Sequence, residues 1–291
     1  MGVIDLDGFC EEVGVDGPVA VEGLGTRGGA PVGVRVVRAP SGIDWVQPDE
    51  MTVCCAAGTP VDELVAALGA HRQTIALPPG GTVGGALATG HADVRRLGWG
   101  PVRDTLLQAR YVSAEGRVVK AGGPTVKNVS GFDLCRLLVG SRGSLGFLGE
   151  VLLRTRPFAR ASQWFTCAAA ELPRVMEVQR RLYRPISLLW DGTTLWALLE
   201  GHPSDIAEQA RLVGLEECAG PPVLPTGGRW SVSPAELSSM HGIFVAEVGV
   251  GVVHHTDPAP ATARDPRVAA LASAVKRELD PTGRMNPGTL V

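Results

Sequence analysis

The chain has 291 residues, of which 45% are hydrophobic and 20% are charged. These fractions are close to those of ordinary globular proteins, so the composition excludes a disordered chain, a coiled coil and collagen. The formal net charge of −3 provides no basic field, which argues against nucleic acid as a partner. The length predicts two folding units.

The sequence contains no pattern typical of a secretory signal, a transmembrane helix or a metal site. The amino-terminal stretch MGVIDLDGFCEE is acidic and lacks the basic and apolar regions of a secretory signal, so we expect a cytoplasmic protein. The longest uncharged stretch, 73–92, contains two prolines and five glycines, which excludes a transmembrane helix there. The six cysteines form no CxxC and no Cys/His ligand spacing, so we expect reduced thiols, no iron–sulfur cluster and no bound metal.

The amino-terminal half alternates short strands and short helices with glycine-rich loops. Thr59 is predicted to cap a helix whose first turn holds Pro60 and Asp62. Hydrophobic periodicity and the turn residues predict strands at 18–23, 32–37, 51–57, 73–77, 105–112, 117–121 and 147–155, and helices at 63–70, 83–90 and 133–139.

The second half has a different order of predicted strands and helices. Its elements follow the order β-α-β-β-α, which is typical of a split antiparallel α+β layer. A Pro- and Gly-rich loop is expected at 221–230, one strand at 243–253, a helix at 265–279 and an irregular tail after it. The earlier elements are predicted at 163–170 (strand), 171–183 (helix), 186–190 and 194–201 (hairpin), and 204–214 (helix).

The first glycine loop, residues 23–29, contains the pattern G-x-G-x-x-G, and Asp44 lies about 20 residues further on. A Rossmann fingerprint must open a helix, but here Pro31 and an alternating strand pattern follow, so that reading is excluded. We expect a nest of main-chain N–H groups for a diphosphate, with Arg27 as a counter-charge. A plain glycine turn is the alternative.

Two further loops have the same character. The second loop, 79–85, leads into a predicted helix, so free N–H groups, the Thr82 hydroxyl and a helix N-terminus are expected to converge on an anion. The third loop, 140–146, presents a surface of small residues before a long apolar strand. Together the loops predict one dinucleotide site, and tight β-corners remain the alternative.

The ordered strings GLGTRGG, PPGGTVGGALATG and KNVSGFDLCRLLVGSRGSLG, with DPTGRMNPG near the end, carry a family resemblance. The chain resembles the FAD-binding domain of the vanillyl-alcohol oxidase/p-cresol methylhydroxylase-type (PCMH-type) flavoproteins. Among these it is most similar to the FAD-binding small subunits of bacterial glycolate oxidase. The resemblance is dense over 19–157 and weaker in the middle of the chain.

The resemblance implies an α+β architecture in three parts. Residues 1–157 would form the two-subdomain PCMH-type FAD-binding domain. Residues 158–242 would form a small antiparallel α+β cap, which looks short for a stand-alone enzyme and would expose a surface to a partner subunit. Residues 243–291 would supply a strand, a helix and a tail that returns to the flavin side.

The resemblance also implies the cofactor and its contacts. In the family, the first loop wraps the FAD pyrophosphate, the second runs under the flavin and diphosphate, and the third lies near the ribityl and adenine parts. Relatives that bind FAD covalently use a first-loop histidine, and positions 23–30 contain none, so we expect non-covalent FAD. The implied cofactor-binding residues are Gly23, Gly25, Thr26, Arg27, Gly28, Gly29, Gly80, Gly81, Thr82, Gly84, Gly85, Ser141, Gly143, Ser144, Leu145, Gly146, Glu150 and Asn286. Lys127, Asn128, Gly131 and Asp133 match a family signature for which we expect a structural role.

Catalytic residues are implied by one further string. Catalytic relatives carry H-A-G-D-G-N-L-H, whereas the aligned residues 247–254 read EVGVGVVH. Glu247 replaces the first histidine and His254 stays in register. The resemblance makes His254, beside Glu247, the base that takes the hydroxyl proton while hydride goes to the flavin. The alternative is that His254 is a polar residue at the end of a strand. For His91 two interpretations also remain: a position near the flavin, or an exposed position at the end of a helix.

The function implied by the resemblance is FAD-dependent oxidation of a glycolate-type 2-hydroxy acid within a multi-subunit oxidase or dehydrogenase. Electrons would pass from the flavin to partner subunits, namely a second FAD-containing catalytic subunit and an iron–sulfur subunit. The chain would reach the inner face of a membrane only through these partners. A self-sufficient FAD-dependent oxidoreductase and a non-catalytic flavin-binding scaffold are the alternatives.

Overall fold

The computed structural model describes residues 4–123, 133–261 and 265–289. Contacts between Cα atoms divide the chain into two compact units. Unit 1 comprises 1–93, 101–158 and 264–291, and unit 2 comprises 94–100 and 159–263. No helix in the described ranges is long and apolar enough to cross a membrane.

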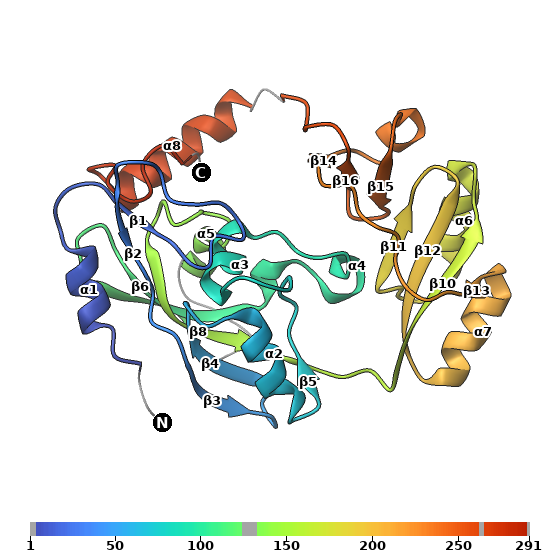
Figure 1. The fold of residues 1–291 in the computed structure, drawn as a ribbon, viewed down its shortest axis with the longest axis horizontal. Coiled ribbons are helices and arrows are strands. Elements are labelled where there is room, and N and C mark those ends of the chain that lie inside the picture. The colour runs from blue at the N-terminus through green and yellow to red at the C-terminus, as the bar shows by residue number, and fades with distance from the viewer. Residues whose placement is uncertain (1–3, 124–132, 262–264, 290–291) are drawn as a thin grey trace. The chain divides into compact units, whose positions relative to one another are not determined.

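Unit 1 is built on a five-stranded antiparallel sheet with three helices on one face (Figure 1). Residues from both layers, such as Val53, Leu64 and Val151, share one core and are fully buried. The helices are α2 (Val61–Gly69), α3 (Val83–Thr89) and α5 (Leu134–Leu138). The strands, in sheet order, are β3 (Ile43–Gln47), β4 (Thr52–Ala56), β8 (Phe147–Arg154), β6 (Leu106–Val112) and β7 (Val118–Gly122).

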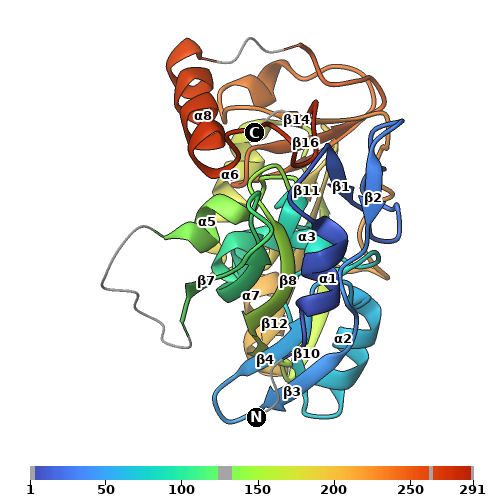
Figure 2. The ribbon, with the colours of Figure 1, turned by 90° about the vertical axis from the view of Figure 1, so that its left-hand side faces the viewer.

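A second, smaller core in unit 1 holds the strand that leads into the first loop. The strands β1 (Val19–Val21) and β2 (Arg35–Val37) pair in parallel, and helix α1 (Asp7–Val13) lies beside them (Figure 2). Val19, Phe147 and the carboxyl-terminal Met285 pack together in this core. The remaining elements of unit 1 are β5 (Gln73–Thr74), η1 (Val102–Asp104), β9 (Arg156–Pro157) and α8 (Pro266–Leu279).

Unit 2 contains a seven-stranded antiparallel sheet. Helices α6 (Leu172–Arg181) and α7 (Pro203–Val213) cover one face, where Leu188, Ala246 and Val253 join their core. Residues that alternate with these, such as Glu247, point to the other face. Unit 2 also contains α4 (Arg96–Trp99) and η2 (Glu236–Ser239). The strands, in sheet order, are β13 (Glu216–Glu217), β10 (Ala161–Ala168), β12 (Thr194–Gly201), β11 (Ser187–Trp190), β15 (Phe244–Glu247), β16 (Val252–His255) and β14 (Gly228–Ser231).

The predicted α+β class and the β-α-β-β-α order are confirmed, but the strand expected at 243–253 is wrong. The chain turns at 248–251 and forms the hairpin of β15 and β16. Gly249 and Gly251 adopt φ angles of +81° and +79°, which favour glycine and allow the turn. This hairpin belongs to unit 2, so the segment expected to form a third part, 243–291, is divided between the two units.

Two local expectations also differ from the structure. Thr59 does not cap α2, because its hydroxyl exchanges hydrogen bonds with the backbone of Gly42, at 3.0 Å in each direction, and Pro60 takes the N-cap position. The strands expected at 32–37 and 73–77 are shorter, because ladder pairing begins only at Arg35 and ends at Thr74. The helix expected at 265–279 is confirmed as α8, which Asp265 caps.

Candidate functional site

The three glycine loops meet at one cavity of about 650 Å³ within unit 1. Ligand sites for small molecules and cofactors typically have volumes of 300–1,000 Å³. The predicted cofactor-binding residues that line the cavity are Gly23, Gly25, Thr26, Arg27, Gly28, Gly29, Thr82, Gly84, Gly85, Ser141, Gly143, Gly146 and Asn286. Segments that are far apart in the sequence therefore share one space.

Five of the predicted residues do not line this cavity, and their contact with FAD stays a prediction. Leu145 is buried in the core of the five-stranded sheet. Glu150 is buried in β8, where it pairs with Arg110 at 3.0 Å. Ser144 is fully buried, and its hydroxyl donates to the Ser141 carbonyl at 2.6 Å. The other two contact the first loop: the Gly80 carbonyl accepts a hydrogen bond from Arg27, and Gly81 packs against the same side chain.

In the first loop, Gly25 and Gly28 have φ angles of +70° and +105° and no atom within 4 Å of an added Cβ. These glycines therefore keep the loop open where it borders the cavity. Gly23 differs, because a Cβ there would lie 2.6 Å from Oγ1 of Thr82. Glycine is therefore needed at position 23 because the first and second loops approach each other closely there. The stretch that contains Gly25 and Gly28 is the part of the loop best suited to bind a diphosphate.

The last three amides of the second loop are already used by hydrogen bonds within the protein. The amides of Val83 and Gly84 donate to the carbonyls of Thr59 and Ala57 at 2.9 and 2.7 Å. The amide of Gly85 donates to Oγ1 of Thr82 at 3.1 Å, which caps α3. The turn before α2 and the cap of α3 use these three donors, so the expected convergence of free N–H groups does not extend to residues 83–85. Thr82, Gly84 and Gly85 line the cavity, so this part of the second loop forms one of its walls.

Arg27 joins the first and second loops. Its Nη2 donates to the carbonyls of Pro78, Pro79 and Gly80 at 3.2, 3.0 and 2.7 Å. Its Nη1 is buried without a hydrogen-bond partner in the described part of the chain. Burial lowers the pKa of this guanidinium, which still keeps its proton at neutral pH. Since a buried N–H without an acceptor is costly, an anionic oxygen in the cavity is the partner that fits it.

The third loop is held by α3 and by its own serine. The amides of Gly140 and Arg142 donate to the last carbonyls of α3, those of Leu87 and Ala88, at 3.0 and 2.8 Å. The Ser141 hydroxyl donates to Leu138 and accepts from the amide of Gly143 at 3.3 Å. Apart from Arg142, the third-loop residues that line the cavity are three glycines and Ser141, so they present mainly backbone to it.

These features fit FAD. The cavity has an open first loop for the diphosphate, a buried guanidinium that lacks an acceptor, and walls of backbone that a flat ring can approach closely. Sequence reasoning did not assign the other lining residues to the site. Several are small or apolar and carry no chemical signal, and His91 was left open. These residues are Val21, Glu22, Leu24, Ala39, Ala57, Gly58, Ala88, Thr89, His91, Leu138, Gly140, Arg142, Phe147, Leu148, Gly288 and Thr289.

The predicted catalytic pair lies in unit 2, on the β15–β16 hairpin. Nε2 of His254 lies 2.9 Å from Oε1 of Glu247. The Glu247 side chain is only 2% exposed and that of His254 is 17% exposed. Oε2 of Glu247 is buried without a hydrogen-bond partner within the described ranges. The pair is therefore a buried carboxylate that orients an imidazole, with one carboxylate oxygen left for a further donor.

Arg229 adds positive charge beside this pair. It lies on β14 directly opposite His254 of β16, and cross-strand partners point to the same face of a sheet. Burial lowers the pKa of the Arg229 guanidinium, and the negative charge of Glu247 opposes that change. Unit 2 thus has a cation, an imidazole and a carboxylate on one face of its sheet.

No group of three or more His, Cys, Asp or Glu side chains is placed to hold a metal ion in 4–123, 133–261 or 265–289. The six cysteines are free thiols. Within the family signature, Asp133 caps α5 by accepting from the amide of Arg136 at 3.2 Å. Lys127, Asn128 and Gly131 lie outside the described residues.

The class of this protein follows from its amino-terminal part. Residues 17–122 match the family described as FAD binding domain, and this part of the chain belongs to it. FAD is therefore the cofactor of unit 1, as predicted. The chain is similar to glycolate oxidase subunit GlcE of Escherichia coli, with 33% identity over 215 residues. That match covers 70% of this chain and 61% of GlcE.

Other relatives match shorter stretches. The D-lactate dehydrogenase of Archaeoglobus fulgidus is 37% identical over 118 residues, which are 40% of this chain and 27% of that protein. Glycolate oxidase subunit GlcD of Bacillus subtilis is 37% identical over 76 residues, 26% of this chain and 16% of GlcD. The chain thus spans less than two thirds of the length of the curated relatives it matches.

Solved structures confirm the predicted PCMH-type fold. Alkyldihydroxyacetonephosphate synthase, in two crystal forms, superposes with TM-scores of 0.66 and 0.69. The superpositions cover 93% and 94% of this chain and 71% and 73% of the synthase, at 14% and 13% sequence identity. At this identity the likeness establishes the fold alone.

Proposed function

We propose that this chain is an FAD-binding subunit of a multi-subunit oxidase or dehydrogenase that oxidises a small 2-hydroxy acid of the glycolate type. The observation that carries the proposal is the convergence of the three glycine loops and Asn286 on one cavity of about 650 Å³. The similarity to a glycolate oxidase subunit over 70% of the chain supports the substrate class.

The proposed roles divide between the two units. In unit 1, the first loop and Arg27 bind the diphosphate, and the second and third loops form the walls that position the cofactor. When bound, FAD supplies a hydride acceptor for oxidation of a C–H bond beside a hydroxyl. In unit 2, His254 takes the hydroxyl proton, Glu247 orients the imidazole, and Arg229 attracts the substrate carboxylate.

Partner subunits complete the proposed enzyme. GlcE and GlcD are named as subunits of glycolate oxidase, which supports a multi-subunit assembly for this chain. In the proposal, a second FAD-containing subunit and an iron–sulfur subunit receive the electrons. Any contact with the inner face of a membrane would run through these partners.

A self-sufficient oxidoreductase is the second candidate, and the contact between His254 and Glu247 favours it. Because the pair joins a proton acceptor to a buried carboxylate, it has the arrangement of a general base. In this candidate, reduction of the flavin by the substrate needs no partner subunit.

The test is an absorbance spectrum of the purified chain, recorded before and after anaerobic addition of glycolate, alone and with co-expressed partner subunits. A flavin band near 450 nm that does not separate from the protein in trichloroacetic acid would contradict non-covalent FAD. The proposal expects the band to bleach with the partners present. Rapid bleaching of the isolated chain supports the second candidate, and a colourless protein that takes up no added FAD overturns both in favour of a scaffold.

A further inference from the structure

The carboxyl-terminal segment, residues 280–289, lies between the first and third loops of the FAD site. The backbone of Met285 bridges Val19 of β1, and the amide of Asn286 donates to the Val19 carbonyl at 2.8 Å. The segment therefore runs along the strand that leads directly into the first loop. Asn286, Gly288 and Thr289 line the cavity itself.

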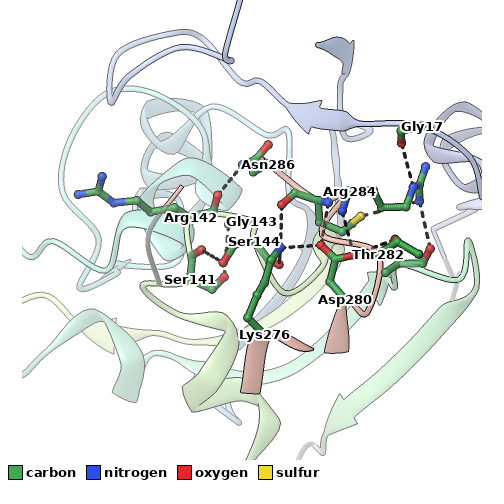
Figure 3. Close-up of polar contacts among 12 residues, drawn as sticks. Gly17, Ser141, Arg142, Gly143, Ser144, Lys276, Asp280, Thr282, Arg284 and Asn286 are labelled. Atoms are coloured by element: carbon green, nitrogen blue, oxygen red, sulfur yellow. Dashed lines mark hydrogen bonds and ion pairs between the residues drawn. The ribbon is translucent and has the colours of Figure 1, made fainter. Parts of the chain in front are cut away.

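Asn286 connects the two loops with one side chain. Its Oδ1 accepts from the amide of Val21, two residues before the first loop begins, at 3.1 Å. Its Nδ2 donates to the carbonyl of Arg142 in the third loop (Figure 3). Its φ angle of +42° is in the left-handed region, which asparagine tolerates better than most residues. The distance between the loops thus depends on where this residue is held.

Lys276 of α8 holds both the segment and the third loop, although it does not line the cavity. Its ammonium donates to the carbonyls of Ser144 and Met285 at 2.5 and 3.0 Å, and to Oδ2 of Asp280 at 2.5 Å. An ammonium has three N–H groups, so all of them are used. Figure 3 shows this side chain at the junction of the helix, the loop and the segment.

Asp280 is the buried counter-charge of Lys276, with a side chain that is 0% exposed. Its Oδ2 also accepts from the amide of Met285 at 2.8 Å, and its Oδ1 accepts from the amide of Arg284 at 3.1 Å. Burial alone would raise the pKa of this carboxyl, but the bond from Lys276 and the two amides outweigh it and lower the pKa. The carboxylate therefore fixes the turn that starts the segment.

Arg284 anchors the same segment to the amino-terminal part of unit 1. Its guanidinium donates to the carbonyls of Val13, Gly14, Gly17 and Ala114 at 2.6, 3.0, 3.0 and 3.1 Å. The residue is only 4% exposed. With this anchor, the segment is attached to the amino-terminal part of unit 1 as well as to α8 and the third loop.

We propose that Lys276 is a positioning residue for FAD and that docking of the carboxyl-terminal segment and binding of FAD are coupled. The inference rests on the FAD site proposed above. The glycine loops have few side chains that could hold them in place, so Asn286 sets the spacing between the first and third loops. Lys276 and Asp280 in turn hold the segment that positions Asn286. Release of Lys276 would then weaken FAD binding without removing any atom that touches FAD. By reciprocity, bound FAD must hold the segment in place.

The test compares the wild type with Lys276→Met/Asp280→Asn, which removes the ion pair without leaving a lone buried charge. Arg277→Met is the matched control, because Arg277 is the exposed neighbour on the same helix. Three quantities are measured: the FAD dissociation constant, the visible circular dichroism of bound flavin, and the rate of tryptic cleavage after Arg284 with and without FAD. The thermal midpoint of each apo-protein is recorded separately.

The double variant is expected to bind FAD at least tenfold more weakly, with an altered flavin dichroism, and Arg277→Met is expected to match the wild type. FAD is expected to slow cleavage after Arg284 in the wild type and not in the double variant. A dissociation constant within twofold of the wild type in the double variant overturns the proposal, even if its thermal midpoint falls. If the double variant does not fold, the wild type alone still tests the coupling. A rate of cleavage after Arg284 that saturating FAD does not change would overturn it. Failure of the wild type to bind any FAD would instead contradict the proposed site.

Discussion

Gly81 of the second loop and Arg27 of the first loop lie so close that a Cβ atom on Gly81 would overlap Nη1 of the arginine. The same position has a φ angle of +65°, which L-residues other than glycine rarely adopt. Gly81 therefore leaves room for the guanidinium of Arg27, a residue that lines the FAD cavity, although Gly81 itself does not line that cavity.

Gly81→Ala is expected to destabilise the protein and to weaken FAD binding. Gly80→Ala is the matched control, because Gly80 has a similar φ of +71° but no atom within 4 Å of an added Cβ. Both variants should lose about 1–2 kcal/mol to backbone strain. Only Gly81→Ala should also displace Arg27 and raise the FAD dissociation constant. Urea unfolding and FAD titration measure the two effects, and equal FAD affinity in both variants would contradict the role of Gly81.

Arg27→Leu is expected to discriminate between FAD and riboflavin, which lacks the diphosphate. If Nη1 donates to a phosphate oxygen, the variant should bind FAD at least tenfold more weakly, a loss of about 1.4 kcal/mol. Its affinity for riboflavin should change little. Fluorescence titration with both ligands provides the measurement. An equal loss for the two ligands would show that Arg27 only supports the second loop.

His254→Ala is expected to destabilise the protein by ~3 kcal/mol, because it removes the hydrogen-bond partner that the buried Glu247 carboxylate has within the described ranges. Adding Glu247→Gln should restore part of this loss, since a neutral amide costs less to bury than a charge. Denaturant unfolding of the two variants and of His71→Ala, an exposed control, measures the difference. A double variant less stable than His254→Ala would show that the carboxylate has other partners.

Acid is expected to release the carboxyl-terminal segment. Because the folded-state pKa of Asp280 lies below its ordinary value, its contribution to stability is present above about pH 4 and is lost as the pH falls through the folded-state value. The difference in unfolding free energy between the wild type and Asp280→Asn should therefore be largest near pH 7 and shrink below about pH 4. A difference that does not depend on pH would contradict an ionised Asp280.

The contact between Glu247 and His254 shows where sequence reasoning reached its limit. The two residues were identified by their place in a family string, but their segment was expected to form one strand. In a single strand, residues seven apart lie about 23 Å from each other. The two glycines at the turn reverse the chain instead, and the imidazole meets the carboxylate. Periodicity could not reveal this, because the apolar run of the first arm continues through the valines and glycines of the turn into the second arm.

By itself, the sequence determined the glycine loops, the strands and helices around them and the family to which they point, because backbone conformation and apolar periodicity are local properties. Only the tertiary structure decided what those loops do. It paired the amides of Val83 and Gly84 with the carbonyls of Thr59 and Ala57, buried Nη1 of Arg27 without a hydrogen-bond partner among the described residues, and brought Lys276 against the third loop. These contacts join residues that are 24 to 132 positions apart, and such partners are chosen by packing of the whole unit rather than by the residues next to them in the chain.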